Sequence, residues 1–93
     1  MTHWLLHYDY VEGIVERRAP YRESHLAHAG AAKDDGRILM AGAVGDPPHG
    51  ALFVWTQREG IEAWVDADPY VRAGLVTAHR VEPWNAVVGG PGS

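Results

Sequence analysis

A histidine and an aspartate are the residues of this sequence that best fit proton-transfer chemistry. His25 lies in R-E-S-H-L (22–26), and Asp68 lies in D-A-D-P-Y-V (66–71). Imidazole titrates near neutral pH and a neighbouring carboxylate fixes its tautomer, so the two together would form a general acid/base pair. Residue spacing alone favours a plainer interpretation, in which Asp66 and Asp68 are solvated turn residues and His25 is a boundary residue.

The six histidines do not predict a metal site. His3 and His7 would lie about 13 Å apart on a strand, too far to share an ion. His25 and His28 are close enough on a helix, but no third ligand has a suitable spacing. The sequence also has no cysteine, no nucleophile elbow and no phosphate-binding glycine loop. We therefore expect neither a metal nor a cofactor.

Composition narrows the class of protein further. The chain has 93 residues and a formal net charge of −4, with acidic and basic residues interspersed. Without a basic stripe, nucleic-acid binding has little support. No apolar run reaches the ~20 residues of a membrane span, and the start lacks the pattern of a signal peptide. We expect a cytoplasmic protein with no membrane partner.

The elements that must position these side chains can be predicted from hydrophobic periodicity. Strands are expected over 2–8, 37–44, 51–56 and 75–84, and helices over 21–35 and 58–67. Pro20 suits the start of the first helix, whose packed side is expected to include Leu26, Ala29 and Ala32. A short helical turn is expected over 11–15. The order βαββαβ predicts an α+β fold of the ferredoxin-like type, a four-stranded antiparallel sheet with both helices on one face.

The opposite face of this sheet is expected to be apolar and uncovered, because the strands carry apolar residues on both sides. Such a face usually marks an interface, so we predict a homodimer in which two sheets pack face to face. One domain is expected over 1–86, followed by a flexible C-terminal tail over 87–93.

Several motifs, in order and at suitable spacing, resemble one family. R-E-S-H-L (22–26), D-D-G-R-I-L-M-A-G-A (34–43), A-W-V-D-A-D-P-Y-V-R-A-G-L-V (63–76) and V-E-P-W (81–84) are similar to the YciI, or YCII-related, proteins. The resemblance covers nearly the whole chain. It implies a ferredoxin-like protomer that forms a dimeric α+β barrel, with a cleft built around a histidine and an aspartate.

The resemblance assigns roles to particular residues. His25 and Asp68 match the histidine and aspartate of the cleft, whereas Asp66 stays a solvated turn acid. Arg22 and Tyr70 match neighbouring positions that would help to hold an anionic or phenolic ligand. The chain departs from the family in having Ala43 where proline is usual and a short connection over 44–50. This departure suggests that His49 is a local addition to the substrate-binding residues.

Two functions of different classes remain open. The first is a small cofactor-independent acid/base enzyme, of the isomerase or lyase type, acting on a small cyclic or phenolic molecule through His25 and Asp68. The resemblance supports it, since one YciI-like branch is associated with dehydrohalogenation of a hydroxylated aromatic. The alternative is a non-catalytic dimeric module that binds a small molecule or a protein.

Overall fold

A computed structural model describes residues 2–89 of the chain. These residues form four strands and four α-helices, with a 3-10 turn, η1, before the longest helix. In chain order the elements are β1 (Thr2–Tyr10), α1 (Ile14–Arg17), η1 (Ala19–Tyr21), α2 (Arg22–Asp34), β2 (Ile38–Val44), β3 (Gly50–Trp55), α3 (Ile61–Ala67), α4 (Pro69–Arg72) and β4 (Val76–Asn85).

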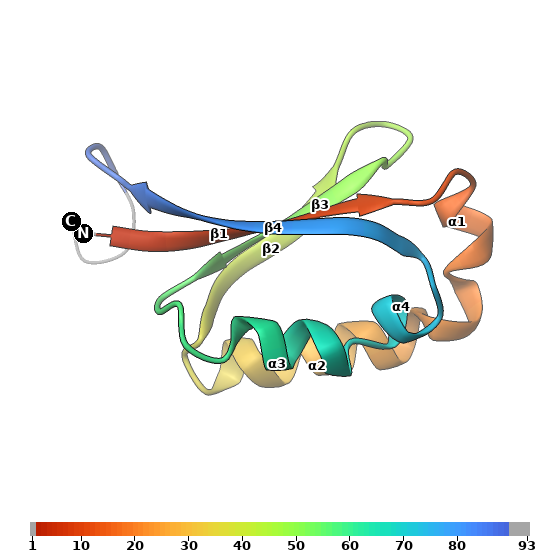
Figure 1. The fold of residues 1–93 in the computed structure, drawn as a ribbon, viewed down its shortest axis with the longest axis horizontal. Coiled ribbons are helices and arrows are strands. Elements are labelled where there is room, and N and C mark those ends of the chain that lie inside the picture. The colour runs from red at the N-terminus through yellow and green to blue at the C-terminus, as the bar shows by residue number, and fades with distance from the viewer. Residues whose placement is uncertain (1, 90–93) are drawn as a thin grey trace.

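The strands form one sheet in the order β2-β3-β1-β4, and every neighbouring pair is antiparallel. In the centre of the sheet, Leu6 of β1 lies opposite Phe53 of β3 on one side and Val81 of β4 on the other. Helices α2, α3 and α4 lie together below the sheet in Figure 1, and no helix covers its upper face within the described residues. The predicted ferredoxin-like arrangement is confirmed.

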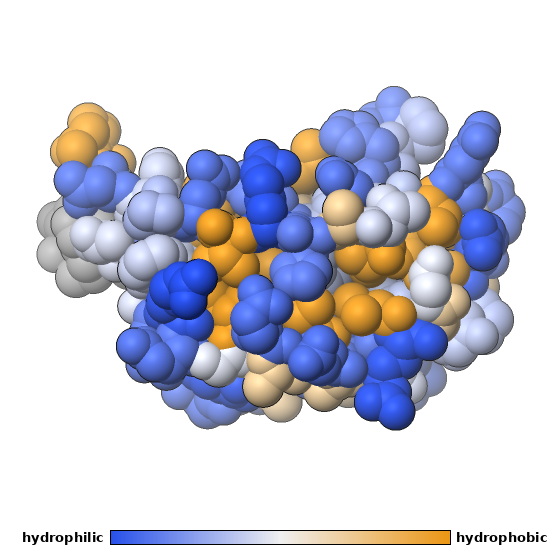
Figure 2. Space-filling model, in the orientation of Figure 1, coloured by the Kyte–Doolittle hydropathy of each residue, from blue (hydrophilic) through white to orange (hydrophobic). Residues whose placement is uncertain are grey.

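The core fills the layer between the sheet and the helices. Aromatic side chains dominate it: Tyr8, Phe53 and Trp55 from the sheet and Trp64 from α3 are each at most 3% exposed. The Phe53 and Trp64 rings meet edge to face, with their centroids 5.2 Å apart. In the view of Figure 2, apolar residues show along the line where the sheet meets the helices, and hydrophilic residues surround them.

Helix α2 is rotated relative to the prediction. Leu26 was expected on the packed side but is 52% exposed, whereas His25 is 6% exposed and Ala32 is fully buried. The packed stripe is therefore His25, Ala29 and Ala32, which has the i, i+4, i+7 spacing of one helix face. The hydrophobic pattern favours Leu26 as the buried residue. His25 is buried instead, because its imidazole forms a hydrogen bond with the buried Asp68 carboxylate, which a leucine side chain could not do.

Some boundaries also differ from the predictions. Helix α3 begins at Ile61 rather than at residue 58, because Gly60 precedes it with a φ of 87°, a conformation outside the helix. The expected turn over 11–15 is α1, which covers Ile14–Arg17. The short helix α4 was not predicted at all. Of the expected tail, 87–89 form no helix or strand and 90–93 lie outside the described residues.

The uncovered face of the sheet is largely apolar. A shallow hollow of about 300 Å³ crosses it, lined by residues of β2 and β3 that include Met40, Val44 and Leu52. Trp84 of β4 is 45% exposed. Polar contacts also occur on this face: Glu82 Oε2 lies 2.6 Å from His7 Nε2 and 3.9 Å from the Arg80 guanidinium. Among residues 2–89, no helix is long and apolar enough to cross a membrane.

Candidate active site

The corner between α3 and α4 holds Asp68. Helix α3 ends at Ala67 and α4 begins at Pro69, which leaves Asp68 between them in an extended conformation (φ −68°, ψ 125°). Proline at the first position of α4 imposes this conformation on the residue before it. The Asp68 side chain caps α4 by accepting a hydrogen bond from the backbone N–H of Tyr70 at 3.0 Å. The Asp-Pro pair therefore fixes where this carboxylate lies.

Asp68 faces His25 across the helix layer. His25 Nδ1 lies 2.8 Å from Asp68 Oδ1, and the two side chains are 7% and 0% exposed. A carboxylate can only accept hydrogen bonds, so Nδ1 carries the hydrogen and donates it. Nε2 is then the free position of the imidazole, and it makes no hydrogen bond to any residue of 2–89. This is the tautomer in which Nε2 can accept a proton.

A tyrosine hydroxyl is the third donor to the carboxylate. The Tyr8 hydroxyl of β1 donates to Asp68 Oδ2 at 2.7 Å in the core. Asp68 thus accepts three hydrogen bonds, from Tyr8, His25 and the Tyr70 backbone, as a buried carboxylate requires. Burial, and then the neighbouring Asp68 charge, raise the pKa of Tyr8 far above its usual range, so this hydroxyl stays a donor at neutral pH.

Two aromatic rings hold the His25 imidazole in place. The Tyr70 ring stacks on it with centroids 3.8 Å apart and planes within 5° of parallel. The Phe53 ring meets it edge-on at 6.2 Å. The imidazole is therefore oriented by a hydrogen bond at one edge and by a stack on one face, which leaves Nε2 in a defined direction.

A pocket of about 330 Å³ opens beside this imidazole, between α2 and the β2–β3 side of the sheet. The pocket is large enough for a small ring compound. Its polar and aromatic lining comes from Tyr10, Arg18, Arg22, His25, Phe53 and Tyr70, and small or apolar residues including Ala41, Ala43, Pro48 and Ala51 form the rest of the wall. Ala43, where the family usually has proline, thus lines the pocket.

The structure brings four of the five predicted site residues together. His25, Arg22 and Tyr70 line the pocket, and Asp68 lies directly behind His25. His49 instead lies in a neighbouring hollow of about 510 Å³, with Glu12 and Glu16 of the α1 region. Asp66 is exposed, which suits the solvated turn acid expected there.

Three pocket or site residues were missed by the sequence reasoning. Tyr8 lies within the strand predicted over 2–8, but nothing in the sequence pattern connects its hydroxyl with residue 68. Tyr10 and Arg18 lie beyond the predicted end of the first strand and in the segment after it. Burial raises the pKa of Tyr10, with Arg18 and Arg22 opposing the rise, so its hydroxyl also stays protonated at neutral pH.

Metal ligands are not grouped at this site. In the part of the chain that the structure describes, no three His, Cys, Asp or Glu side chains are arranged to hold an ion. The polar groups at the pocket are one imidazole, phenol hydroxyls and guanidinium groups, which can move a proton or hold a negative charge.

The fold and the buried pair define a ferredoxin-like α+β protein with a His–Asp site under its sheet. The model of the YCII-related domain matches residues 1–85, and the chain belongs to this family. Protein YciI of Escherichia coli O6:H1 is 34% identical over 84 residues, covering 78% of this chain and 86% of that protein. An uncharacterised protein of Haemophilus influenzae is 34% identical over 88 residues, covering 83% and 90%.

The solved structures extend the likeness of the fold. The 5-chloro-2-hydroxyhydroquinone dehydrochlorinase of Burkholderia phenoliruptrix AC1100, in complex with 2,5-dihydroxybenzoquinone, superposes with a TM-score of 0.73. It is 22% identical to this chain, and the match covers 89% of this chain and 93% of the dehydrochlorinase. At this identity the comparison shows a shared fold.

Proposed function

We propose that this protein is a small acid/base enzyme of the isomerase or lyase type, which acts on a small cyclic or phenolic molecule without a cofactor. The observation that carries the proposal is the buried contact of His25 Nδ1 with Asp68 at 2.8 Å, which leaves Nε2 free beside a pocket of about 330 Å³. A base held in one tautomer, next to space for a substrate, is what general base catalysis needs.

The reaction would begin with proton transfer to His25. Nε2 accepts a proton from an activated C–H or O–H bond of the ring, and the bonding electrons move into the ring towards an oxygen. The resulting imidazolium is stabilised by the Asp68 carboxylate on its other nitrogen. In an isomerisation the proton returns to a different atom of the ring. In an elimination the electrons instead expel a leaving group, such as halide, and the proton is released to water.

The fold of the dehydrochlorinase suggests the first compound to assay. The wild-type protein should release chloride from 5-chloro-2-hydroxyhydroquinone, or exchange activated ring protons of related phenols and cyclic ketones with deuterium from D2O, as followed by NMR. General acid/base groups contribute ~10²–10⁴-fold to a rate. His25→Gln and Asp68→Asn should therefore each reduce turnover by about 100-fold or more.

His79→Gln is the matched control, because His79 also contacts a carboxylate, Glu62 at 2.9 Å, but lies exposed on β4. Circular dichroism should show that each variant is folded under the assay conditions. Full turnover in folded His25→Gln would refute the proposal. A ring compound that binds in the pocket and is recovered unchanged, without deuterium, would favour the non-catalytic binding module.

We also propose that the protein forms a homodimer through the uncovered face of its sheet. The support is the apolar hollow over β2 and β3 together with exposed Trp84 and Met40, a set of side chains that a monomer would leave in water. Sedimentation at micromolar concentration should give a dimer, and Leu52→Glu should convert it to a monomer. A wild-type monomer would contradict the proposed interface.

A further inference from the structure

Two arginines at one end of the pocket are not paired with any acid. Arg18, half-buried, follows α1, and Arg22 begins α2. Both line the pocket beside His25. Within residues 2–89 neither forms an ion pair, whereas Arg37 and Arg80 contact Asp35 and Glu82. Two positive charges therefore face the same small space without a negative partner from the described chain.

The buried Tyr70 hydroxyl is a further polar group at this pocket whose hydrogen has no acceptor within residues 2–89. Tyr70 is 2% exposed, and no group among the described residues accepts the hydrogen of its hydroxyl. An unpartnered buried hydroxyl is costly unless something else accepts its hydrogen. Burial raises the pKa of this hydroxyl, and the positive charges of Arg18 and Arg22, together with the Arg22 guanidinium as a donor to the hydroxyl oxygen, oppose the rise. Arg18, Arg22 and Tyr70 line the same pocket, so the two guanidinium groups lie beside the space into which this hydroxyl would donate.

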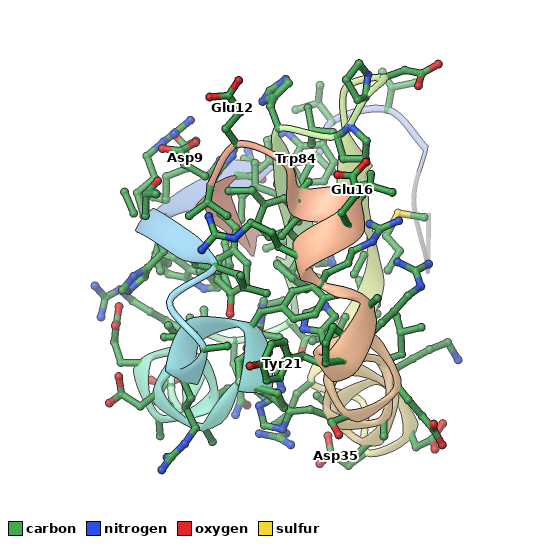
Figure 3. The ribbon with its side chains drawn as sticks, turned by 90° about the vertical axis from the view of Figure 1, so that its right-hand side faces the viewer. Asp9, Glu12, Glu16, Tyr21, Asp35 and Trp84 are labelled. Carbon is green, nitrogen blue, oxygen red and sulfur yellow. The ribbon has the colours of Figure 1, made fainter. Side chains whose placement is uncertain are left out.

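Acidic side chains are absent from this wall as far as the structure describes it. The pocket lining contains neither aspartate nor glutamate, and the nearby Asp68 carboxylate is already occupied by its three donors. Figure 3 looks onto this end of the molecule. Tyr21, the residue before Arg22, lies between the ribbons of α4 and the start of α2, and Glu12 and Glu16 lie above it around α1. These two glutamates line the neighbouring hollow instead.

We infer that the pocket selects a planar ring that carries an anionic oxygen, with Arg18 and Arg22 holding the charge and the Tyr70 hydroxyl donating to the same oxygen. The apolar wall of Ala41, Ala43 and Ala51 would accept the body of the ring. The inference rests on the proposed function, because proton transfer from the ring to His25 leaves a negative charge on a ring oxygen, and it is this anionic form that the pocket would hold. It adds Arg18 as a residue that determines specificity.

4-Nitrophenol is a suitable probe, since its neutral and ionised forms absorb differently and it offers His25 no activated carbon proton. Spectral titrations with the wild-type protein should show the phenolate binding at least about tenfold more tightly than the neutral phenol. A tenfold preference lowers the apparent pKa of the bound dye by about one unit. Hydrogen bonds to charged groups have this order of magnitude.

Arg18→Gln and Arg22→Gln should each weaken the preference for the phenolate, and the double variant should abolish it. Tyr70→Phe keeps the stacked ring but removes the donor, so it should weaken phenolate binding more than phenol binding. Arg72→Gln is the matched control, because it removes the same charge from an exposed position on α4 outside the pocket. It should leave the preference unchanged.

Three results would overturn the inference: equal affinity for the two forms of the dye, an unchanged preference in the double variant, or no binding by the wild-type protein at millimolar dye. The test is independent of turnover. If His25→Gln keeps full turnover while the arginine variants lose the preference, the acid/base proposal fails alone. If His25→Gln loses turnover while the protein binds both forms of the dye equally, only the inference that the pocket selects an anionic ring is refuted.

Discussion

Removing the Tyr8 hydroxyl should show how much its hydrogen bond to the buried Asp68 carboxylate contributes to the free energy of unfolding. Asp68 is fully buried and accepts three hydrogen bonds, and the one from Tyr8, at 2.7 Å, is the shortest of them. Tyr8→Phe keeps the ring in the core and leaves Oδ2 without this donor. Hydrogen bonds to charged groups contribute about 1.5–3 kcal/mol, and water cannot reach this site to replace the lost one.

We therefore expect Tyr8→Phe to lower the free energy of unfolding by about 1.5–3 kcal/mol. For a domain of this size, about 1 kcal/mol shifts Tm by roughly 4–8 °C, so the melting temperature should fall by about 6–24 °C. Urea unfolding followed by tryptophan fluorescence gives the free energy directly. Tyr10→Phe is the matched control, because Tyr10 lines the pocket and, unlike Tyr8, does not donate to the Asp68 carboxylate.

A double-mutant cycle separates the hydrogen bond from other effects of the substitution. Combining Tyr8→Phe with Asp68→Asn should give an interaction energy of about 1–3 kcal/mol, as for groups in one hydrogen-bond network. If Tyr8→Phe stays within about 0.5 kcal/mol of the wild type, the level of an ordinary surface substitution, the reasoning about the buried carboxylate is wrong.

Two further predictions concern the backbone beside the site and the response to alkali. Gly50→Ala should destabilise the protein by about 2 kcal/mol or more, a large value for a point mutant, because a side chain there would collide with the Tyr8 carbonyl oxygen. Gly30→Ala is the control, since nothing lies close to that position, and urea unfolding should show it to be neutral or stabilising. The pKa values of Tyr8 and Tyr10 are raised from the usual 10, so the stability that they contribute is fully present below pH 10 and is lost as the pH rises towards their folded values. In an alkaline titration, Tyr8 and Tyr10 should therefore ionise only at the pH where tryptophan fluorescence reports unfolding. If all four tyrosines show tyrosinate absorbance before that change, the pKa values of Tyr8 and Tyr10 are not raised by the fold.

The order of elements could be predicted because each one carries a strong local pattern. Alternating apolar residues marked the strands, and the spacing of Ile61, Trp64 and Val65 marked α3. The short helix α4 was missed although its signature is present: aspartate at the N-cap followed by proline at the first position is a helix start. The same residues were interpreted as a turn, since four residues of helix leave almost no periodicity to detect.

The site could be predicted only in part from the residues themselves. His25 and Asp68 are 43 positions apart, and no local pattern states that they meet. The family motifs supplied the pair, but they did not supply Tyr8, which reaches the same carboxylate from the opposite layer. Helix α2 shows the same limit of local patterns. Hydrophobicity favours Leu26 as the packed residue, but the hydrogen bond from His25 to Asp68, which no local pattern reveals, determines which side of the helix faces the core.

The wall opposite His25 is built from small side chains on the β2–β3 hairpin, and the base is anchored elsewhere. Ala41, Ala43 and Ala51 face the pocket, while the hydrogen bond and the stacked ring that orient the imidazole come from Asp68 and Tyr70 at the start of α4. Of the groups that hold the imidazole, Phe53 is the one on the hairpin. Substitutions on the hairpin can therefore reshape the space offered to a ligand while the proton-transfer geometry is retained. A scaffold with this separation is suited to acquiring new substrates by a few changes in one hairpin, and it offers a starting point for redesign.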